Sequence, residues 1–134
     1  MAEDKVEFEL VSPEELLVTE AVEMVVIPGE EGDFGVLPRH APMLSTVRPG
    51  VISIYENNAV RDRIFVAGGF AEVTPERCTV LAEMALPVSD IDRADAEQKL
   101  SDARDDVKDA KDDAERRAAE RQVAAFEAML AVSG

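Results

Sequence analysis

Cysteine, histidine and tryptophan are nearly absent from this sequence. Among 134 residues there are one cysteine, one histidine and no tryptophan. The single cysteine, Cys78, cannot form an internal disulfide, and its place in an apolar run predicts a buried thiol. One histidine and one cysteine are too few to build a metal site from these ligands, and the nucleophile motif Gly-x-Ser-x-Gly is missing. We therefore expect no catalytic site, no metal and no cofactor.

Basic residues and long hydrophobic runs are also scarce. The sequence has 14 Lys and Arg against 29 Asp and Glu, which gives a net charge of −15. Binding to nucleic acid or to anionic lipid requires clustered basic residues, so neither is expected as a partner. The apolar runs are shorter than the roughly 20 residues that cross a bilayer, and the acidic start does not resemble a targeting peptide. The sequence therefore predicts a soluble protein that stays where it is made.

The first two-thirds of the sequence has a period of two residues. Val6, Phe8 and Leu10 alternate with glutamates, and the later apolar runs are separated by turn residues. Asn57-Asn58 can adopt positive φ, and a proline turn at 74–77 leads into another apolar run. Residues 1–88 are therefore predicted to form an antiparallel β-sandwich or flattened barrel.

The last third, residues 89–134, has helical spacing. Ser89 or Asp90 can cap a helix, and an alanine-rich apolar stripe follows at steps of three and four residues. The stripe changes phase between Ala114 and Ala119, which predicts two helices folded as an antiparallel hairpin, with one long bent helix as the alternative. The fold class is thus α+β by segments. Because alanine methyl groups stabilise packing weakly, we expect a tail that docks weakly and can open.

Two stretches rich in glycine and proline point to a known family. Residues 29–42 read GEEGDFGVLPRHAP, and residues 67–73 read AGGFAEV. Both resemble motifs in the N-terminal domain of the epsilon subunit of F-type ATP synthase, the homologue of the mitochondrial delta subunit. The resemblance continues through Arg48-Pro49-Gly50 into the helical end and covers nearly the whole sequence.

The resemblance implies a non-catalytic subunit of the rotor in the central stalk. It implies that the sandwich binds the gamma subunit and the c ring, and that the helices regulate ATP hydrolysis through contacts with the alpha and beta subunits. The expected location is the cytoplasmic face of a bacterial inner membrane, with an organelle-encoded homologue as the alternative source. A different class of function, a free-standing β-sandwich adaptor that binds a partner helix, is the second hypothesis.

The acidic loop is the candidate contact with the c ring. The resemblance implies that this loop faces the ring, and its candidate residues are Glu30, Glu31, Asp33 and His40. Carboxylates on a glycine-flanked tip can orient docking onto basic loops, although an ordinary solvated loop explains them as well. His40 is interpreted as a residue that shapes the loop through a backbone hydrogen bond.

The helical tail has a degenerate nucleotide motif. Many relatives have the pattern [IL]-D-x-x-R-A for ATP binding, whereas this sequence reads IDRADA over residues 91–96. Ile91, Asp92 and Ala96 match the pattern, but Asp95 stands where the arginine belongs and would repel phosphates. We therefore expect weak or no specific ATP binding. The candidate regulatory contacts are the arginines of the second helix, Arg116, Arg117 and Arg121.

Overall fold

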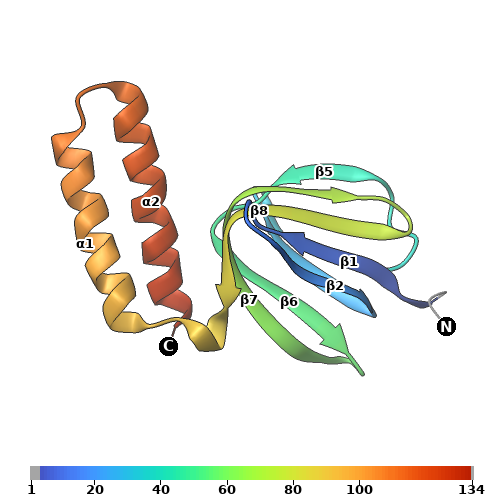
Figure 1. Ribbon diagram of the computed structural model, residues 1–134. Coiled ribbons are helices and arrows are strands. Elements are labelled where there is room, and N and C mark those ends of the chain that lie inside the picture. Colours follow the sequence, from blue (N-terminus) through green and yellow to red (C-terminus); the bar gives the residue numbers. More distant parts are fainter. Residues whose placement is uncertain (1–3, 134) are drawn as a thin grey trace. The chain divides into compact units, whose positions relative to one another are not determined.

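The computed structural model describes residues 4–133. The protein divides into two compact units, Met1–Pro87 and Val88–Gly134. The first unit consists of β-strands and the second of helices, as Figure 1 shows. This arrangement confirms the predicted fold class. Among the described residues, no helix has both the length and the apolar character needed to span a bilayer.

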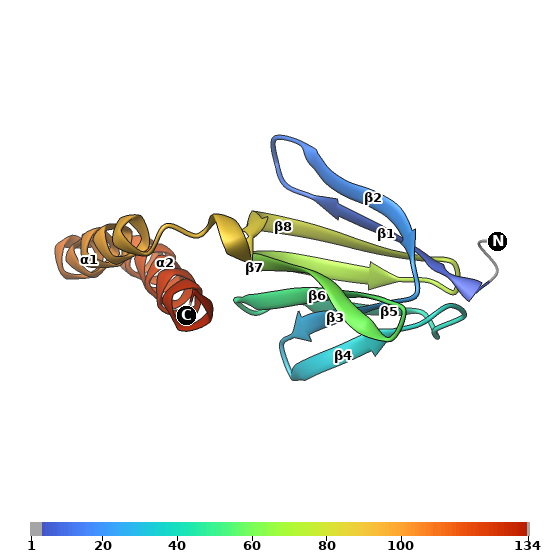
Figure 2. The same cartoon turned by 90° about the horizontal axis from the view of Figure 1, so that it is seen from below.

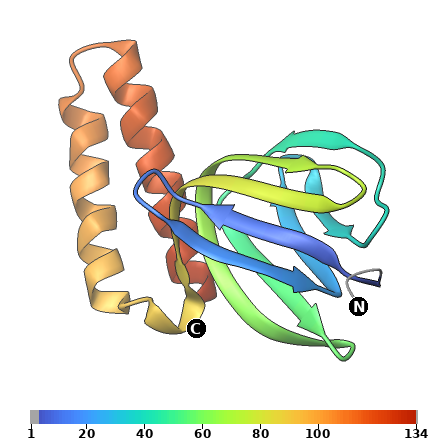
Figure 3. The same ribbon diagram turned by 45° about the vertical axis from the view of Figure 1, so that its right-hand side comes forward.

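Eight strands of the described residues form the first unit as one continuous sheet. They are β1 (Val6–Val11), β2 (Leu16–Val22), β3 (Met24–Gly29), β4 (Gly32–Val36), β5 (Met43–Thr46), β6 (Gly50–Glu56), β7 (Ala59–Val73) and β8 (Arg77–Pro87). The order of pairing is β2-β1-β8-β7-β6-β3-β4, with β5 paired to β7. The sheet folds over on itself, so that β1, β2 and β8 lie on one side and β3, β4 and β6 on the other (Figures 2 and 3).

One pair of strands is parallel, which the prediction of an antiparallel sandwich did not include. β1 runs parallel to β8, with Phe8 opposite Cys78 and Leu10 opposite Val80. A tight turn fixes antiparallel direction only for strands that it joins directly. β1 and β8 are the first and last strands of the unit, so the long connection between them leaves either direction open.

The core of the sandwich follows the period-two pattern of the sequence. In β1, Val6, Phe8 and Leu10 are fully buried, while the alternating glutamates are half-buried. The inner faces of both sides contribute to one cluster, in agreement with a sandwich whose strands each bury one face. Its members include Val6, Phe8, Leu10, Val25, Ile27, Val36, Ile52, Ile54, Ala71, Val73, Cys78, Val80 and Ala82.

A glycine pair allows β7 to belong to both sides of the fold. Before this pair β7 is matched with β6, Val66 lying opposite Gly50, and after it β7 is matched with β5, Phe70 lying opposite Thr46. Gly68 and Gly69 have φ of 74° and 98°. These angles lie in a region that residues with a Cβ rarely adopt. The Gly-Gly sequence therefore makes the corner of the sandwich.

Two predicted turns are confirmed. Asn57 and Asn58 connect β6 to β7 with φ of 55° and 63°. The backbone N–H of Thr74 donates to the carbonyl of Arg77 at 2.8 Å, which closes the proline turn before β8. Asparagine tolerates left-handed backbone, and proline fixes φ, so both turns could be inferred from local sequence.

The second unit begins with the short helix η2 (Val88–Asp90), followed by α1 (Arg93–Asp109) and α2 (Asp113–Val132). The two α-helices pack against each other as an antiparallel hairpin, so the single bent helix is excluded (Figure 1). The expected position of the first cap was wrong. Asp92, instead of Ser89 or Asp90, caps α1, and Asp112 caps α2, each accepting the backbone N–H three residues later.

The break between the helices comes earlier than the change in the apolar stripe suggested. Ala110 is extended, with ψ of 135°, and ends α1, so Ala114 already lies in α2. A capping aspartate can start a helix without glycine or proline, which explains why the break left little signal in the sequence. The buried side chains of the two helices are mostly small: Ala96, Leu100, Ala103, Ala119, Ala125, Phe126 and Met129.

Candidate interaction surfaces

The acidic loop is a hairpin that connects β3 to β4. Gly29 lies opposite Gly32, and Glu30 and Glu31 form the turn between them. The backbone N–H of Glu30 donates to the carbonyl of Thr46 at 3.0 Å, and its carboxylate accepts a short hydrogen bond from the Thr46 hydroxyl. The Glu30 side chain is therefore directed toward β5 and is not free at the tip.

Asp33 is exposed but is also engaged by a neighbouring side chain. Its carboxylate pairs with the guanidinium of Arg48 at 2.7 Å, and the same guanidinium donates to the carbonyl of Gly29 at 3.1 Å. Glu31, by contrast, is exposed and makes no ion pair with any residue in the range 4–133. The structure thus brings the three predicted carboxylates together in one hairpin and leaves Glu31 as the one presented outward.

His40 lies in the segment that follows β4 and is exposed. Its Nδ1 lies 2.6 Å from the backbone carbonyl of Ala41, within hydrogen-bond distance, and its backbone N–H donates to the carbonyl of Leu37 at 3.2 Å. This geometry confirms the interpretation of His40 as a loop-shaping residue. A role for His40 in binding stays a prediction.

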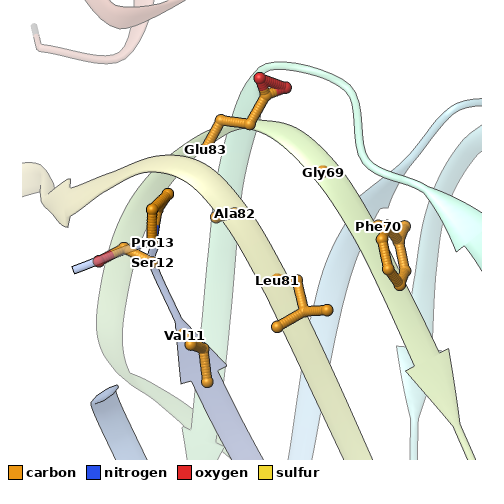
Figure 4. Close-up of a pocket in the computed structure, with 8 residues that line it drawn as sticks. All are labelled: Val11, Ser12, Pro13, Gly69, Phe70, Leu81, Ala82 and Glu83. Carbon is orange, nitrogen blue, oxygen red and sulfur yellow. The ribbon is translucent and has the colours of Figure 1, made fainter. Parts of the chain in front are cut away.

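A row of apolar side chains lies across the outer face of the sheet, and sequence reasoning missed it. Phe70 in β7 lies opposite Leu81 in β8, Leu81 lies opposite Val11 in β1, and Val11 lies opposite Leu16 in β2. Phe70 is 43% exposed and Leu81 is 40% exposed. Figure 4 shows Phe70, Leu81 and Val11 side by side across three strands. We call Phe70, Leu81, Val11 and Leu16 the apolar row.

The apolar row has neighbours that shape it into a shallow groove. Ser12, Pro13 and Glu83 line the groove beside Phe70 and Leu81. The outer-facing neighbours of Phe70 and Leu81 along their strands, Glu72 and Glu83, are both exposed carboxylates. The signal that could have found this surface is a large apolar residue at a position that alternation assigns to solvent.

The degenerate nucleotide motif starts α1. Asp92 is the N-cap, Ala96 is buried, and Ile91 donates its backbone N–H to the carbonyl of Val88 at 3.2 Å. Asp95 pairs with Lys99 one turn later at 3.0 Å. These contacts give each motif residue a local structural role, while the absence of ATP binding stays a prediction.

Arg93, inside the same motif, contacts the end of the other helix. Its Nη1 donates to the carbonyl of Leu130 at 3.2 Å and to the hydroxyl of Ser133 at 3.0 Å. The last turn of α2 has no basic residue of its own. Arg93 therefore supplies the positive charge and the hydrogen bonds that the negative end of that helix favours.

The three arginines of α2 are exposed but not equivalent. Arg116 pairs with Asp113 at 2.9 Å, three residues earlier in the helix. Arg117 and Arg121 form no ion pair within the described part of the protein, and they lie four residues apart on one helical face. Of the predicted regulatory residues, these two have their charges available to a partner.

Two family models match the sequence. The model described as ATP synthase, Delta/Epsilon chain, beta-sandwich domain, matches residues 5–88, and the model of the C-terminal domain of the ATP synthase epsilon subunit matches residues 92–134. The protein belongs to the ATP synthase epsilon chain family. The recognition made from the two glycine motifs is thereby confirmed.

Relatives of known sequence agree with this family. The ATP synthase epsilon chain of Rhodospirillum rubrum is 56% identical over 125 residues, covering 93% of this chain and 93% of the relative. That of Maricaulis maris is 53% identical over 130 residues, covering 97% of this chain and 97% of the relative. These alignments extend through both units of the epsilon chain fold.

Solved structures give the same assignment. One protein in the cryo-EM structure of the Euglena gracilis mitochondrial ATP synthase, OSCP/F1/c-ring in rotational state 1, has a TM-score of 0.78 and 27% identity, covering 98% of this chain and 82% of that protein. A protein of the Tetrahymena thermophila central stalk and c ring shares the fold, with a TM-score of 0.61. The predicted function, a central-stalk subunit of F-type ATP synthase, is confirmed, and the free-standing adaptor is not favoured.

Cys78 is a core residue of the sandwich. Its side chain is fully buried among the apolar residues of the sandwich, as the sequence predicted. Burial raises the pKa of the Cys78 thiol from 9.0 to about 12, because the apolar surroundings disfavour the charged thiolate. The thiol is therefore inert at neutral pH.

We expect the free energy of unfolding to depend on pH above pH 9 because of the buried Cys78 thiol. Between pH 9 and about 12 the unfolded protein has lost the Cys78 proton while the folded protein keeps it. The free energy of unfolding should therefore fall by about 1.4 kcal/mol per pH unit from this group, and the contribution is fully present below pH 9. Urea unfolding of wild type and Cys78→Ala at several pH values measures it. Equal pH slopes for the two proteins would contradict the assignment.

Proposed function

We propose that the β-sandwich unit joins the gamma subunit to the c ring and takes no part in catalysis. The observation that carries this proposal is the apolar row on the outer face of the sheet. Its residues are not part of the buried core of the sandwich. The lone histidine is engaged with backbone and the lone cysteine is buried, so neither is placed to act on a substrate. A rigid sandwich with two distinct outer surfaces suits a part that connects two neighbours.

The apolar row is the proposed contact with the gamma subunit. Exposed Phe70 and Leu81 are large enough to serve as anchors at the centre of an interface. Leu44, 69% exposed on the adjoining β5, extends the apolar area. The carboxylates of Glu72 and Glu83 at its margins favour a partner surface with an apolar centre and basic residues around it.

The Gly29–Asp33 hairpin is the proposed contact with the c ring. Glu31 carries the charge that a basic ring loop can meet, because Glu30 and Asp33 are engaged with Thr46 and Arg48. A single unpaired surface carboxylate orients docking more than it strengthens it. The hairpin and the apolar row are distinct surfaces of the same rigid unit, so that both partners can bind together.

The experiment for this proposal measures the two contacts separately. Isolated gamma should bind the full-length protein, and a Glu31→Lys variant should bind gamma with unchanged Kd. In the reconstituted complex the same variant should lower proton pumping per ATP hydrolysed. Failure of the wild-type protein to bind gamma would reject the gamma contact, and normal pumping with Glu31→Lys would reject the contact with the ring.

The place of action follows from membership in the complex. We propose that the protein is held at the cytoplasmic face of a bacterial inner membrane by its neighbours in the ATP synthase. Support comes from the epsilon chains of Rhodospirillum rubrum and Maricaulis maris, which are 56% and 53% identical to it. Fractionation of cells should place the protein with membranes that hold the complex and release it when the rotor is stripped off.

The helical unit is proposed to regulate ATP hydrolysis. Arg117 and Arg121 present unpaired charges on one face of α2 within the described residues, which suits acidic surfaces of the alpha and beta subunits. To reach those surfaces the hairpin formed by α1 and α2 must open. Its few large buried residues, Leu100, Phe126 and Met129, make that change energetically accessible.

Removing Arg93 is expected to loosen the closed hairpin. Arg93→Ala deletes two hydrogen bonds to the end of α2, and amide exchange in the last turn of α2 should rise about five- to tenfold. Hydrogen exchange measured by NMR on the full-length protein tests this. Arg104→Ala is the matched control, because it removes another inter-helix contact of an arginine, with Glu127, without touching backbone. Equal effects of the two substitutions would show that Arg93 has no special role.

A further inference from the structure

A three-residue segment lies between the two proposed interaction surfaces. Thr46 is the last residue of β5, and Val47 and Arg48 follow it before β6. On one side Thr46 lies opposite Phe70 of the apolar row, and the N–H of Val47 donates to the carbonyl of Gly69 at 3.1 Å. On the other side the segment reaches the acidic hairpin.

The contact of this segment with the hairpin is a short antiparallel ladder. The N–H of Arg48 donates to the carbonyl of Pro28 at 2.9 Å, Val47 bridges Gly29, and the carbonyl of Thr46 accepts from Glu30 at 3.0 Å. Val47 is 5% exposed and belongs to the core. The base of the hairpin is therefore attached to the interior of the sandwich by backbone hydrogen bonds.

Two side chains of the segment extend the ladder toward the tip. The Thr46 hydroxyl binds the Glu30 carboxylate, and the planar Arg48 guanidinium donates to both the Gly29 carbonyl and the Asp33 carboxylate. An arginine can span a carbonyl and a carboxylate in this way because its donors form a rigid fork, which lysine lacks. Both contacts constrain the residues on either side of Glu31.

We propose that Arg48, with Thr46, is the positioning residue that fixes Glu31 relative to the apolar row. The pair engages the carboxylates of Glu30 and Asp33 in surface contacts, and it holds the tip so that the unpaired carboxylate of Glu31 meets the ring at a set place. This inference rests on the proposed function for its consequence in the complex. Its structural part, the ordering of the hairpin, stands independently of any partner.

Arg48→Ala is expected to free the hairpin without unfolding the sandwich. Exchange of the Glu30 amide, which donates to the carbonyl of Thr46, should rise about tenfold in the isolated full-length protein, because the contacts that order the turn are weakened. Arg48→Lys keeps the charge but loses the fork, and it should raise exchange about threefold. Arg63→Ala, which removes an exposed arginine that forms no ion pair among residues 4–133, should leave the hairpin unchanged.

The reconstituted complex tests the consequence for coupling. Proton pumping per ATP hydrolysed should fall for Arg48→Ala and stay normal for Arg63→Ala, while the Kd for gamma is unchanged in both. The combination Arg48→Ala with Asp33→Ala should add little to Arg48→Ala alone, since removal of Arg48 already breaks the contact with Asp33.

The outcomes separate this inference from the proposed function. Unchanged amide exchange in Arg48→Ala would overturn the positioning role. So would an Arg48→Lys variant whose amide exchange and proton pumping per ATP hydrolysed equal those of wild type. Loss of coupling with Glu31→Lys beside normal coupling with Arg48→Ala would also overturn it. If Glu31→Lys pumps normally, the contact with the ring is rejected, and amide exchange still decides whether Arg48 orders the hairpin.

Discussion

Gly69→Ala is expected to lower the free energy of unfolding of the sandwich by about 2–5 kcal/mol. A Cβ at position 69 would lie 1.7 Å from the carbonyl oxygen of Leu81, where neighbouring backbone cannot move aside as a side chain could. The φ of 98° adds the strain of a conformation that alanine avoids. Because this corner lets β7 change partner from β6 to β5, both sides of the fold should be affected.

The single tyrosine makes the measurement specific to this unit. Tyr55 lies in β6, and tryptophan is absent, so tyrosine fluorescence during urea unfolding reports on the sandwich. Gly32→Ala is the matched control: its φ is 139°, but a Cβ there meets no atom within 4 Å. The difference between the two variants isolates the close approach to Leu81. Equal losses of stability would mean that backbone strain alone decides the corner.

Phe70→Ala is expected to weaken binding of gamma by roughly 30- to 900-fold in Kd, the range for an aromatic anchor that contributes about 2–4 kcal/mol. Phe70 is 43% exposed in the free protein, so its truncation should cost the fold little while removing the largest side chain of the apolar row. Titration calorimetry with isolated gamma measures the change. Circular dichroism checks that the variant is folded.

Val60→Ala is the control for this prediction. Val60 is also 43% exposed and lies in β7, but near the β6–β7 turn and outside the apolar row. It should bind gamma with wild-type affinity. If Phe70→Ala binds gamma as tightly as Val60→Ala does, the apolar row is not the gamma surface.

Local sequence was sufficient to predict those features whose geometry depends on a single residue type or on a simple alternation. Asn57-Asn58 and the proline turn before β8 were predicted because asparagine tolerates positive φ and proline fixes φ. The alternation in β1 likewise predicted which side chains are buried. The caps of the helices were harder to predict, because several aspartates near each end have similar capping ability, and the tertiary position of the segment selects among them.

The candidate surfaces were predictable in part. The acidic hairpin was predicted from its glycines, but the sequence did not show which of its three carboxylates contact other side chains. Glu30 and Asp33 are engaged by Thr46 and Arg48, which lie 16 and 15 residues away in the sequence. The apolar row was missed for the same reason, since β1, β2, β7 and β8 each contribute one member and only strand pairing places them side by side.

The sequence by itself determined the family, the division into strands and helices, and the burial of Cys78, because motifs, periodicity and composition are properties of neighbouring residues. The tertiary structure decided the parallel pairing of β1 with β8, the outer apolar row and the isolation of Glu31 as the free carboxylate. Each of these depends on which distant strands lie together. That choice is made by the packing of the whole core, and no local stretch of residues contains it.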